Sequence, residues 1–377
     1  MAETVLTNAR LVLPDTVLDG TLVMRAGSIV AIQPGRSQLP GAIDCQGDHL
    51  MPGAVDLHTD NLERQVLPRS NARWPSRSAL IAHDAQCAAA GVTTVLDALC
   101  LGDLGFSAPR MQTFREGVAD LDALADTGLL KAEHFLHLRC ELPAADMLAM
   151  LDPVAEHRLV RMVSLMDHSP GSGQYADLQS FRAMRLEQGS DPAGLDQMIA
   201  EIIARRAQIR APNRRALLAR LRHREVALAS HDDRTAEEVA ENAADGIRIS
   251  EFPVSHEAAA AARAAGMGVI AGAPNIVRGG SHSGNVSATD LLCCGHVDAL
   301  ASDYVPAALI EAAFRVASTG IALPQAAGMV SDVPARMVGL TDRGRLAPGL
   351  RADLVRLRVH EGVPVMRMVW REGARIA

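Results

Sequence analysis

The chain has 377 residues, of which 48% are hydrophobic but only 3% aromatic, and its formal net charge is −7. This length suits one large α/β domain with an accessory part, and a core of small aliphatic side chains favours parallel strands alternating with helices over an all-β sandwich. The negative charge argues against general nucleic-acid binding and leaves any affinity for anions to local groups of arginines.

Both ends of the chain are rich in short β-type segments. Residues 1–52 contain apolar and β-branched runs that are separated by Asp-Gly, Ala-Gly and Pro-Gly, which are turn signals. Residues 345–377 repeat this pattern. We therefore expect a small β-sandwich domain formed by both termini, and a different domain between them at residues 53–344.

The central part alternates between strand-like and helix-like segments. A capping box at Thr235–Glu238 opens one expected helix, and Ala-rich stretches end at Gly91 and near Gly266. Eight strands are expected, at 54–58, 92–99, 134–141, 160–167, 226–231, 246–251, 267–273 and 297–303. This alternation predicts a (β/α)₈ barrel of the TIM type.

One connection, at about residues 170–225, is far longer than the usual loop between barrel elements. It contains two helical patterns and ten arginines between Arg182 and Arg224. These arginines either form the solvated face of a helix or cap an anionic site, and the sequence leaves both interpretations open.

The six cysteines form no C-x-x-C pair, and no stretch of about 18 apolar residues occurs. The N-terminus has no cationic segment followed by an apolar run. We therefore expect a cytoplasmic protein with no membrane partner, and we also expect it to form a homo-oligomer.

Histidines and carboxylates recur where the expected strands end. A single histidine in such a place is often only structural, but the carboxyl ends of parallel barrel strands meet at one face. The residues are His58, Asp60, Glu141, Asp167, His168, His231, Asp232, Asp233, Glu251 and Asp303. Gathered together, they would repel one another unless a cation lay among them. Mixed nitrogen and oxygen ligands suit Zn²⁺, with Mn²⁺ or Fe²⁺ next, so we expect one or two divalent metals.

Several motifs resemble those of the amidohydrolase superfamily, whose members are metal-dependent hydrolases on (β/α)₈ barrels. They include "MPGAVDLHTD", "GVTTVLDAL", a late "SD" and "GRLAPGLRADLVRL". More narrowly, "HLRCELP", "MDHSPGSGQY", "ASHDD", "GAPNIVRGGSHSGNVSA" and "SDYVPAAL" resemble the phosphonate-metabolism branch, which acts in the carbon–phosphorus lyase pathway. The resemblance covers nearly the whole chain. It implies hydrolysis of a phosphoanhydride, with release of diphosphate from a ribose triphosphate phosphonate.

The resemblance also implies a set of metal ligands. Asp60 stands where most members carry a second histidine, and Glu141 replaces a carboxylated lysine as the bridging ligand. Asp303 is expected to be both a ligand and the general base. The full set is His58, Asp60, Glu141, His168, His231 and Asp303, with Glu251 in reserve.

The ligand histidines of the superfamily usually end the fifth and sixth barrel strands. Here the predicted strands place His168 on the fourth strand and His231 on the fifth. Either a strand is miscounted or Glu251 replaces a ligand.

The first candidate for binding the triphosphate tail is the Gly-rich segment 273–285, after the expected seventh strand. Its glycines let backbone N–H groups approach anionic oxygens, although a plain turn is the alternative. The candidate residues are Arg278, Gly279, Gly280, Ser281, His282, Ser283 and Asn285. Further candidates, each with an equally acceptable structural role, are Arg69, Asp232 and Tyr304.

Two rival functions stay open. The first is a cyclic-amide hydrolase or deacetylase on the same barrel, although a neutral amide would not require the donor-rich loop or the Arg-rich insertion. The second is a barrel without catalysis that serves as a scaffold, although every expected strand end still holds a group that can bind metal.

Overall fold

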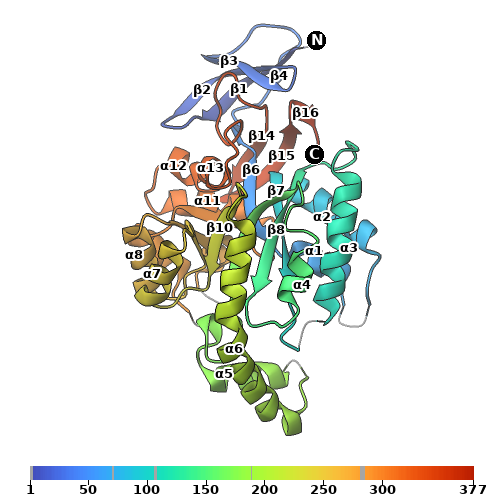
Figure 1. Ribbon diagram of the computed structural model, residues 1–377. Helices are drawn as coiled ribbons and strands as arrows, with labels where there is room; N and C mark the ends of the chain where they lie inside the picture. Colours follow the sequence, from blue (N-terminus) through green and yellow to red (C-terminus); the bar gives the residue numbers. More distant parts are fainter. Residues whose placement is uncertain (1–2, 70–71, 106–107, 188, 281–284) are drawn as a thin grey trace.

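The computed structural model describes residues 3–69, 72–105, 108–187, 189–280 and 285–377. Its centre is a barrel of parallel strands surrounded by helices, and a second sheet lies at one end of this barrel (Figure 1). The barrel strands are β6 (Ala54–Thr59), β7 (Val92–Leu101), β8 (Glu133–Glu141), β9 (Val160–Met166), β10 (Ala227–His231), β11 (Ile249–Glu251), β12 (Gly268–Gly272) and β13 (Ala299–Ala301).

The barrel strands pair in chain order, from β6 to β13. The first and last strands meet where the backbone N–H of Asp303 donates to His58 O at 2.9 Å and that of Asp60 donates to Asp303 O at 2.7 Å. This arrangement confirms the predicted α/β barrel, and the eight strands differ from their expected bounds by only a few residues. It also makes β9 the fourth strand and β10 the fifth, so no strand was miscounted.

The helices follow the strands and cover the outside of the barrel. They are α1 (Asn61–Val66), α2 (Ser76–Ala89), α3 (Ala108–Leu124), α4 (Met147–Leu151), α7 (Ala236–Ala244), α8 (His256–Ala264), α9 (Ala273–Arg278), α10 (Ala288–Cys293), α11 (Ala308–Ser318), α12 (Leu323–Gly328) and α13 (Asp332–Met337). The predicted capping box is present, because the Thr235 side chain accepts from Glu238 N while the Glu238 carboxylate accepts from Thr235 N. Across the described residues, no helix combines the length and the apolar character that crossing a bilayer requires.

The segment predicted as a Gly-rich loop begins with a short helix. Helix α9 carries Pro274 in its first turn, where the missing N–H of proline costs nothing, and ends at Gly279, whose φ of 80° only glycine adopts without strain. The candidate loop therefore starts at the end of α9 rather than at the end of β12.

Strands from both termini form the second sheet, as the sequence predicted. Its order is β16-β15-β14-β5-β1-β2-β3, with β4 paired to β1, and β5 lies antiparallel to β14. A buried ion pair between Arg356 Nε and Asp48 Oδ2, 2.7 Å apart, ties the two termini together. The strands are β1 (Glu3–Val12), β2 (Val17–Arg25), β3 (Ser28–Pro34), β4 (Ile43–Asp44), β5 (His49–Pro52), β14 (Leu354–His360), β15 (Val363–Arg371) and β16 (Ala374–Arg375). The exact division at residues 52 and 345 stays a prediction.

The long insertion between β9 and β10 forms the 3₁₀ turn η1 (Gly173–Tyr175), α5 (Leu178–Glu187) and α6 (Pro192–Leu221). Figure 1 shows α5 and the adjoining end of α6 beyond the barrel, at the end away from the terminal sheet. Several arginines of α6 pair with acidic residues of the barrel. For example, Arg206 Nε and Arg210 Nε lie 2.6 and 3.2 Å from Asp167 Oδ2. These arginines attach the helix to the barrel, next to His168.

Candidate metal centre

A cavity of about 360 Å³ opens at the carboxyl ends of the barrel strands. It gathers most of the residues that the sequence singled out. The predicted residues that line it are His58, Asp60, Glu141, His168, His231, Asp232, Asn285, Asp303 and Tyr304. Arg69, Arg278, Gly279 and Gly280 are described by the structure but are not part of this lining. Ser281, His282 and Ser283 lie outside the described residues.

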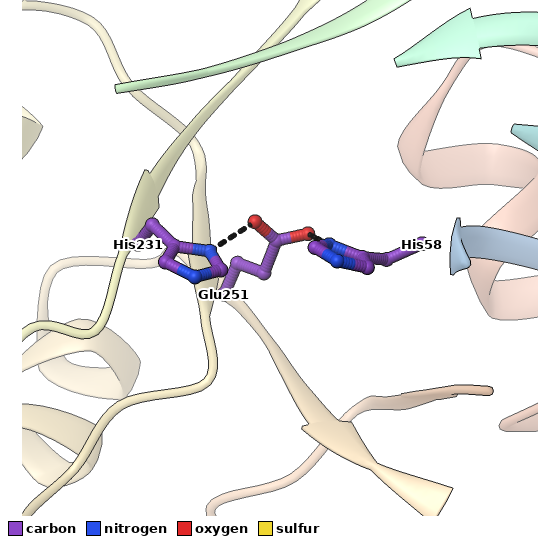
Figure 2. Close-up of side chains that lie close together, drawn as sticks. All are labelled: His58, His231 and Glu251. Atoms are coloured by element: carbon purple, nitrogen blue, oxygen red, sulfur yellow. Dashed lines mark hydrogen bonds and ion pairs between the residues drawn. The ribbon is translucent and has the colours of Figure 1, made fainter. Parts of the chain in front are cut away.

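A buried glutamate holds two of the histidines (Figure 2). His58 Nδ1–H donates to Glu251 Oε1 at 2.7 Å, and His231 Nδ1–H donates to Glu251 Oε2 at 2.6 Å. The Ser164 hydroxyl also donates to Glu251 Oε2, at 2.9 Å. Glu251 is fully buried and does not line the cavity, so it holds the two histidines from the side that faces away from the cavity. With Nδ1 protonated, the Nε2 lone pair of each ring is available on the other side.

A second glutamate holds the third histidine in the same way. His168 donates its backbone N–H to Glu141 Oε1 at 2.8 Å and its ring Nδ1–H to Glu141 Oε2 at 2.7 Å. Burial opposes the ionisation of Glu141, but its hydrogen bonds and charge interaction with His168, together with Arg139, outweigh it and lower the pKa of that carboxyl. Both oxygens of Glu141 thus serve to orient His168, and its role as a bridging ligand stays a prediction.

The Nε2 atoms of the three histidines approach aspartate oxygens without forming hydrogen bonds. His58 Nε2 lies 3.5 Å from Asp60 Oδ1, whereas His168 Nε2 and His231 Nε2 lie 3.7 and 3.8 Å from Asp232 Oδ2. These separations exceed normal hydrogen-bond lengths. Asp232 Oδ2 is buried and has no hydrogen-bond partner among the residues that the structure describes. A buried, unsatisfied carboxylate beside two imidazole nitrogens is a donor set that suits a divalent cation.

Two groups of potential ligands line this cavity. His58, Asp60 and Asp303 form one, and His168, His231 and Asp232 form the other, and in each group the donor atoms lie within 4.8 Å of one another. We call these six residues the mouth cluster. Their residue types fit one or two divalent metals of the kind that the sequence predicted. His58, His231 and Glu251 meet the same distance limit, but Glu251 lies behind the lining, so its reserve role as a ligand stays a prediction.

Two aspartates of the mouth cluster adopt left-handed backbone conformations. Asp232, directly after β10, has φ 57°, and Asp303, just after β13, has φ 56°. Aspartate tolerates this region better than most residues, and strained backbone is common at functional sites. Here the conformation turns the chain sharply at the end of the strand, so that both side chains remain at the cavity.

The charges of the cavity include a buried arginine that the sequence analysis missed. Arg139 NH1 donates to Asp60 Oδ1 at 2.7 Å. Burial opposes the ionisation of Asp60, but Arg139 and His58 outweigh it and hold the pKa of Asp60 well below its usual range. Burial likewise opposes the protonation of His58, yet Glu251 and Asp60 together raise its pKa to about 10, so a cation bound at Nε2 would take the place of a proton there. Arg139 lies two residues before Glu141 on β8. Because side chains two residues apart in a strand share a face, the position of Glu141 could have identified Arg139 from the sequence.

A second buried cluster lies in the barrel wall, between α2, β7 and β8. We call His83, Asp84, Asp97 and His134 the wall cluster. His83 Nε2–H donates to Asp97 Oδ1 at 2.7 Å and accepts at Nδ1 from the Asn61 amide at 2.9 Å. His134 donates from Nδ1 to Asp97 Oδ2 at 2.8 Å and from Nε2 to Asp84 Oδ1 at 3.2 Å. Each ring nitrogen of the wall cluster therefore has a partner.

Comparison with known proteins places this geometry in context. No protein-family model matches the chain. The chain is 43% identical, over 376 residues, to the alpha-D-ribose 1-methylphosphonate 5-triphosphate diphosphatase of Escherichia coli strain K12, and the alignment covers 99% of this chain and 100% of that protein.

Solved structures with the same fold are much more distant in sequence. An N-acetyl-D-glucosamine-6-phosphate deacetylase from Mycobacterium smegmatis is 18% identical, with a TM-score of 0.64, and the match covers 99% of this chain and 100% of that chain. A 5-methylcytosine deaminase from Klebsiella pneumoniae is 15% identical, with a TM-score of 0.63, over 99% and 98% of the two chains. At these identities the likeness supports the fold alone.

Proposed function

The chain belongs to the family of the alpha-D-ribose 1-methylphosphonate 5-triphosphate diphosphatase, within the amidohydrolase superfamily, and we propose that it releases diphosphate from that triphosphate. One structural observation supports the proposal independently of the sequence similarity. Three histidines at the barrel mouth have Nδ1 bound by buried glutamates, while their Nε2 atoms face aspartate oxygens beyond hydrogen-bond distance. This pattern supports a metal-dependent hydrolase.

We propose that the mouth cluster holds one or two divalent ions, with Zn²⁺ first and Mn²⁺ or Fe²⁺ as alternatives. Such an ion lowers the pKa of water and neutralises charge on phosphoryl oxygens. Glu251 and Glu141 keep the ligand histidines in the required tautomer and orientation. Arg139 keeps Asp60 ionised, and so preserves its charge for a cation.

Asp303 is the proposed general base. Its backbone is fixed by hydrogen bonds to His58 O and from Asp60 N, so its side chain lies at the junction of the first and last strands. In the proposed reaction its carboxylate accepts a proton from the attacking water and passes it to the leaving diphosphate. Because diphosphate leaves readily once its charge is matched, charge neutralisation contributes more than proton delivery.

Asn285 and Tyr304 line the cavity and remain candidates for contacts to the substrate, whereas Asp232, which the sequence offered for the same purpose, is proposed here as part of the mouth cluster. Arg278 ends α9 and Gly279 and Gly280 follow it; none of the three lines the cavity, and their contact with the triphosphate stays a prediction. Arg69 is also outside the lining, and its proposed phosphate contact has the weakest support.

A panel of substrates tests the function directly. Diphosphate release from alpha-D-ribose 1-methylphosphonate 5-triphosphate is measured beside hydrolysis of dihydroorotate, hydantoin and N-acetylglucosamine 6-phosphate. We expect activity on the triphosphate only. Activity confined to the amides would overturn the proposal in favour of a cyclic-amide hydrolase or deacetylase.

The cytoplasmic location and the homo-oligomer stay predictions of the sequence. Light scattering of the purified protein measures the oligomer. A molar mass of 40.0 kDa at micromolar concentration, which is that of one chain, would contradict the oligomer.

A further inference from the structure

The arginines of the insertion do not all serve the same purpose. Arg206 and Arg210 contact Asp167, Arg214 contacts Asp245, and Arg220 contacts Asp152. These pairs attach the insertion to the barrel. Arg185 of α5 is different, because among the described arginines of the insertion it is the one that lines the mouth cavity.

Arg185 is held in place by an aromatic ladder that leads to the mouth cluster. Its guanidinium lies 5.1 Å from the centre of the Phe181 ring. The Phe181 ring lies 5.2 Å from that of Tyr175, which in turn lies 5.9 Å from that of His168. Phe181 is buried, so the ladder is a fixed part of the wall. A guanidinium is a planar group whose N–H donors match the oxygens of a phosphate.

Arg110 of α3 lines the same cavity and adds positive charge to it. Its Nε donates to Glu63 Oε2 at 2.7 Å. Burial lowers the pKa of Arg185, and the charge of Arg110 lowers it further. A polyanion bound beside Arg185 would offset the burial and the charge of Arg110 that disfavour its cationic form. A neutral amide substrate would not.

We propose that Arg185 and Arg110 form a subsite for the terminal diphosphate of the substrate, next to the mouth cluster. This inference rests on the proposed function, and it locates the leaving group on the wall formed by α3 and α5. The subsite differs from the loop at residues 278–285, which the sequence suggested for the same purpose. It also explains why the insertion is part of the enzyme, since α5 supplies one of the two cations.

Binding of inorganic diphosphate to the metal-loaded protein tests the subsite without requiring catalysis. Isothermal titration calorimetry gives the dissociation constant, and metal content is measured before and after each titration. We expect Arg185→Ala to weaken binding by about 10- to 100-fold, because a charge-assisted contact is lost, and Arg185→Lys to recover part of the affinity. An unchanged dissociation constant in Arg185→Ala would overturn the proposal.

The chain offers a matched control in the same helix. Arg182 of α5 is 42% exposed and lies 2.7 Å from Asp196, away from the cavity lining. Arg182→Ala removes the same charge from the same helix, so we expect a dissociation constant within about 2-fold of the wild type. A loss equal to that of Arg185→Ala would show that only net charge matters, and would also overturn the proposal.

Arg110 requires a variant that does not leave its partner unpaired. Glu63→Gln alone is the reference, and Arg110→Gln in that background removes the cation without exposing a buried carboxylate. We expect the double variant to bind diphosphate about 10-fold more weakly than Glu63→Gln. Equal affinities would remove Arg110 from the subsite.

Steady-state kinetics separates this inference from the proposed function. If the wild type releases diphosphate but Arg185→Ala keeps its full kcat/KM, the subsite is wrong and the function stands. If the wild type hydrolyses no triphosphate, yet Arg185→Ala still loses affinity for diphosphate, the function is wrong and the subsite stands.

Discussion

The mouth cluster and the wall cluster are built from the same residue types in the same barrel, but they satisfy their ring nitrogens differently. In the mouth cluster, each histidine has one nitrogen on a buried glutamate and the other 3.5 to 3.8 Å from an aspartate oxygen. In the wall cluster, both nitrogens of His83 and His134 lie within 3.2 Å of a partner.

This difference shows that proximity of histidines and carboxylates does not by itself make a metal site. A metal needs donor atoms that the protein leaves unsatisfied, and the wall cluster has used its ring nitrogens in hydrogen bonds. His134 donates from both nitrogens and must therefore be an imidazolium. Burial opposes this charge, but Asp97 and Asp84 together outweigh it and raise the pKa of His134 to about 9. The comparison supports catalysis at one cluster and stability at the other.

The largest expected effect is on catalysis at the mouth cluster. Asp303→Asn keeps the size of the side chain but cannot accept a proton, so kcat for diphosphate release should fall about 10³-fold. Metal analysis of the same preparation should show most of the metal retained. A variant with a nearly normal rate would remove Asp303 from the role of general base.

The next effect concerns stability at the wall cluster. Asp97→Asn leaves the buried imidazolium of His134 without its main counter-charge, so the free energy of unfolding should fall by about 3 kcal/mol. Chemical denaturation measures this loss. The metal content of the folded fraction should equal that of the wild type, and a parallel loss of metal would mean that the wall cluster also binds an ion.

A matched substitution behind the mouth cluster, at Glu251, should lower the metal affinity, whereas Asp97→Asn should lower the stability. Glu251→Gln weakens the hydrogen bonds that orient His58 and His231, so metal affinity should fall by about 10- to 100-fold. Competition with a chromogenic chelator gives the affinity, with Asp97→Asn as the control. Equal metal affinity in the two variants would contradict the assignment of metal binding to the mouth cluster and not to the wall cluster.

The smallest expected effect is a pH dependence of stability. The pKa of His134 is raised above its ordinary value of 6.5 to about 9, so its stabilising contribution is complete below about pH 6.5 and is lost as the pH rises through 9. The unfolding free energy of the wild type should therefore drop by about 1 to 2 kcal/mol between pH 7 and pH 9. Asp97→Asn should show a shallower slope, and identical slopes would contradict the assignment of an imidazolium.

The fold was predictable because its signals are local. Runs rich in apolar and β-branched residues, such as 92–99, are typical of strands that are covered on both faces, and β7 is indeed buried along its whole length. The capping box at Thr235 likewise marks a helix start within four residues of sequence. The start of α9 was not predicted from the sequence. The two glycines that follow this helix are a loop signal, so the whole segment was interpreted as a loop.

The sequence by itself determined the order of the barrel strands and which residue types end them, since strand period, caps and turn glycines depend on near neighbours in the chain. Only the tertiary structure decided which of those residues pair. Glu251 meets His58 across 193 positions, and Arg139 meets Asp60 across 79. Such partners come together only when the strands pair into the barrel and their ends converge. For the same reason, neither the satisfied wall cluster nor the place of Arg185 could be read from spacing in the chain.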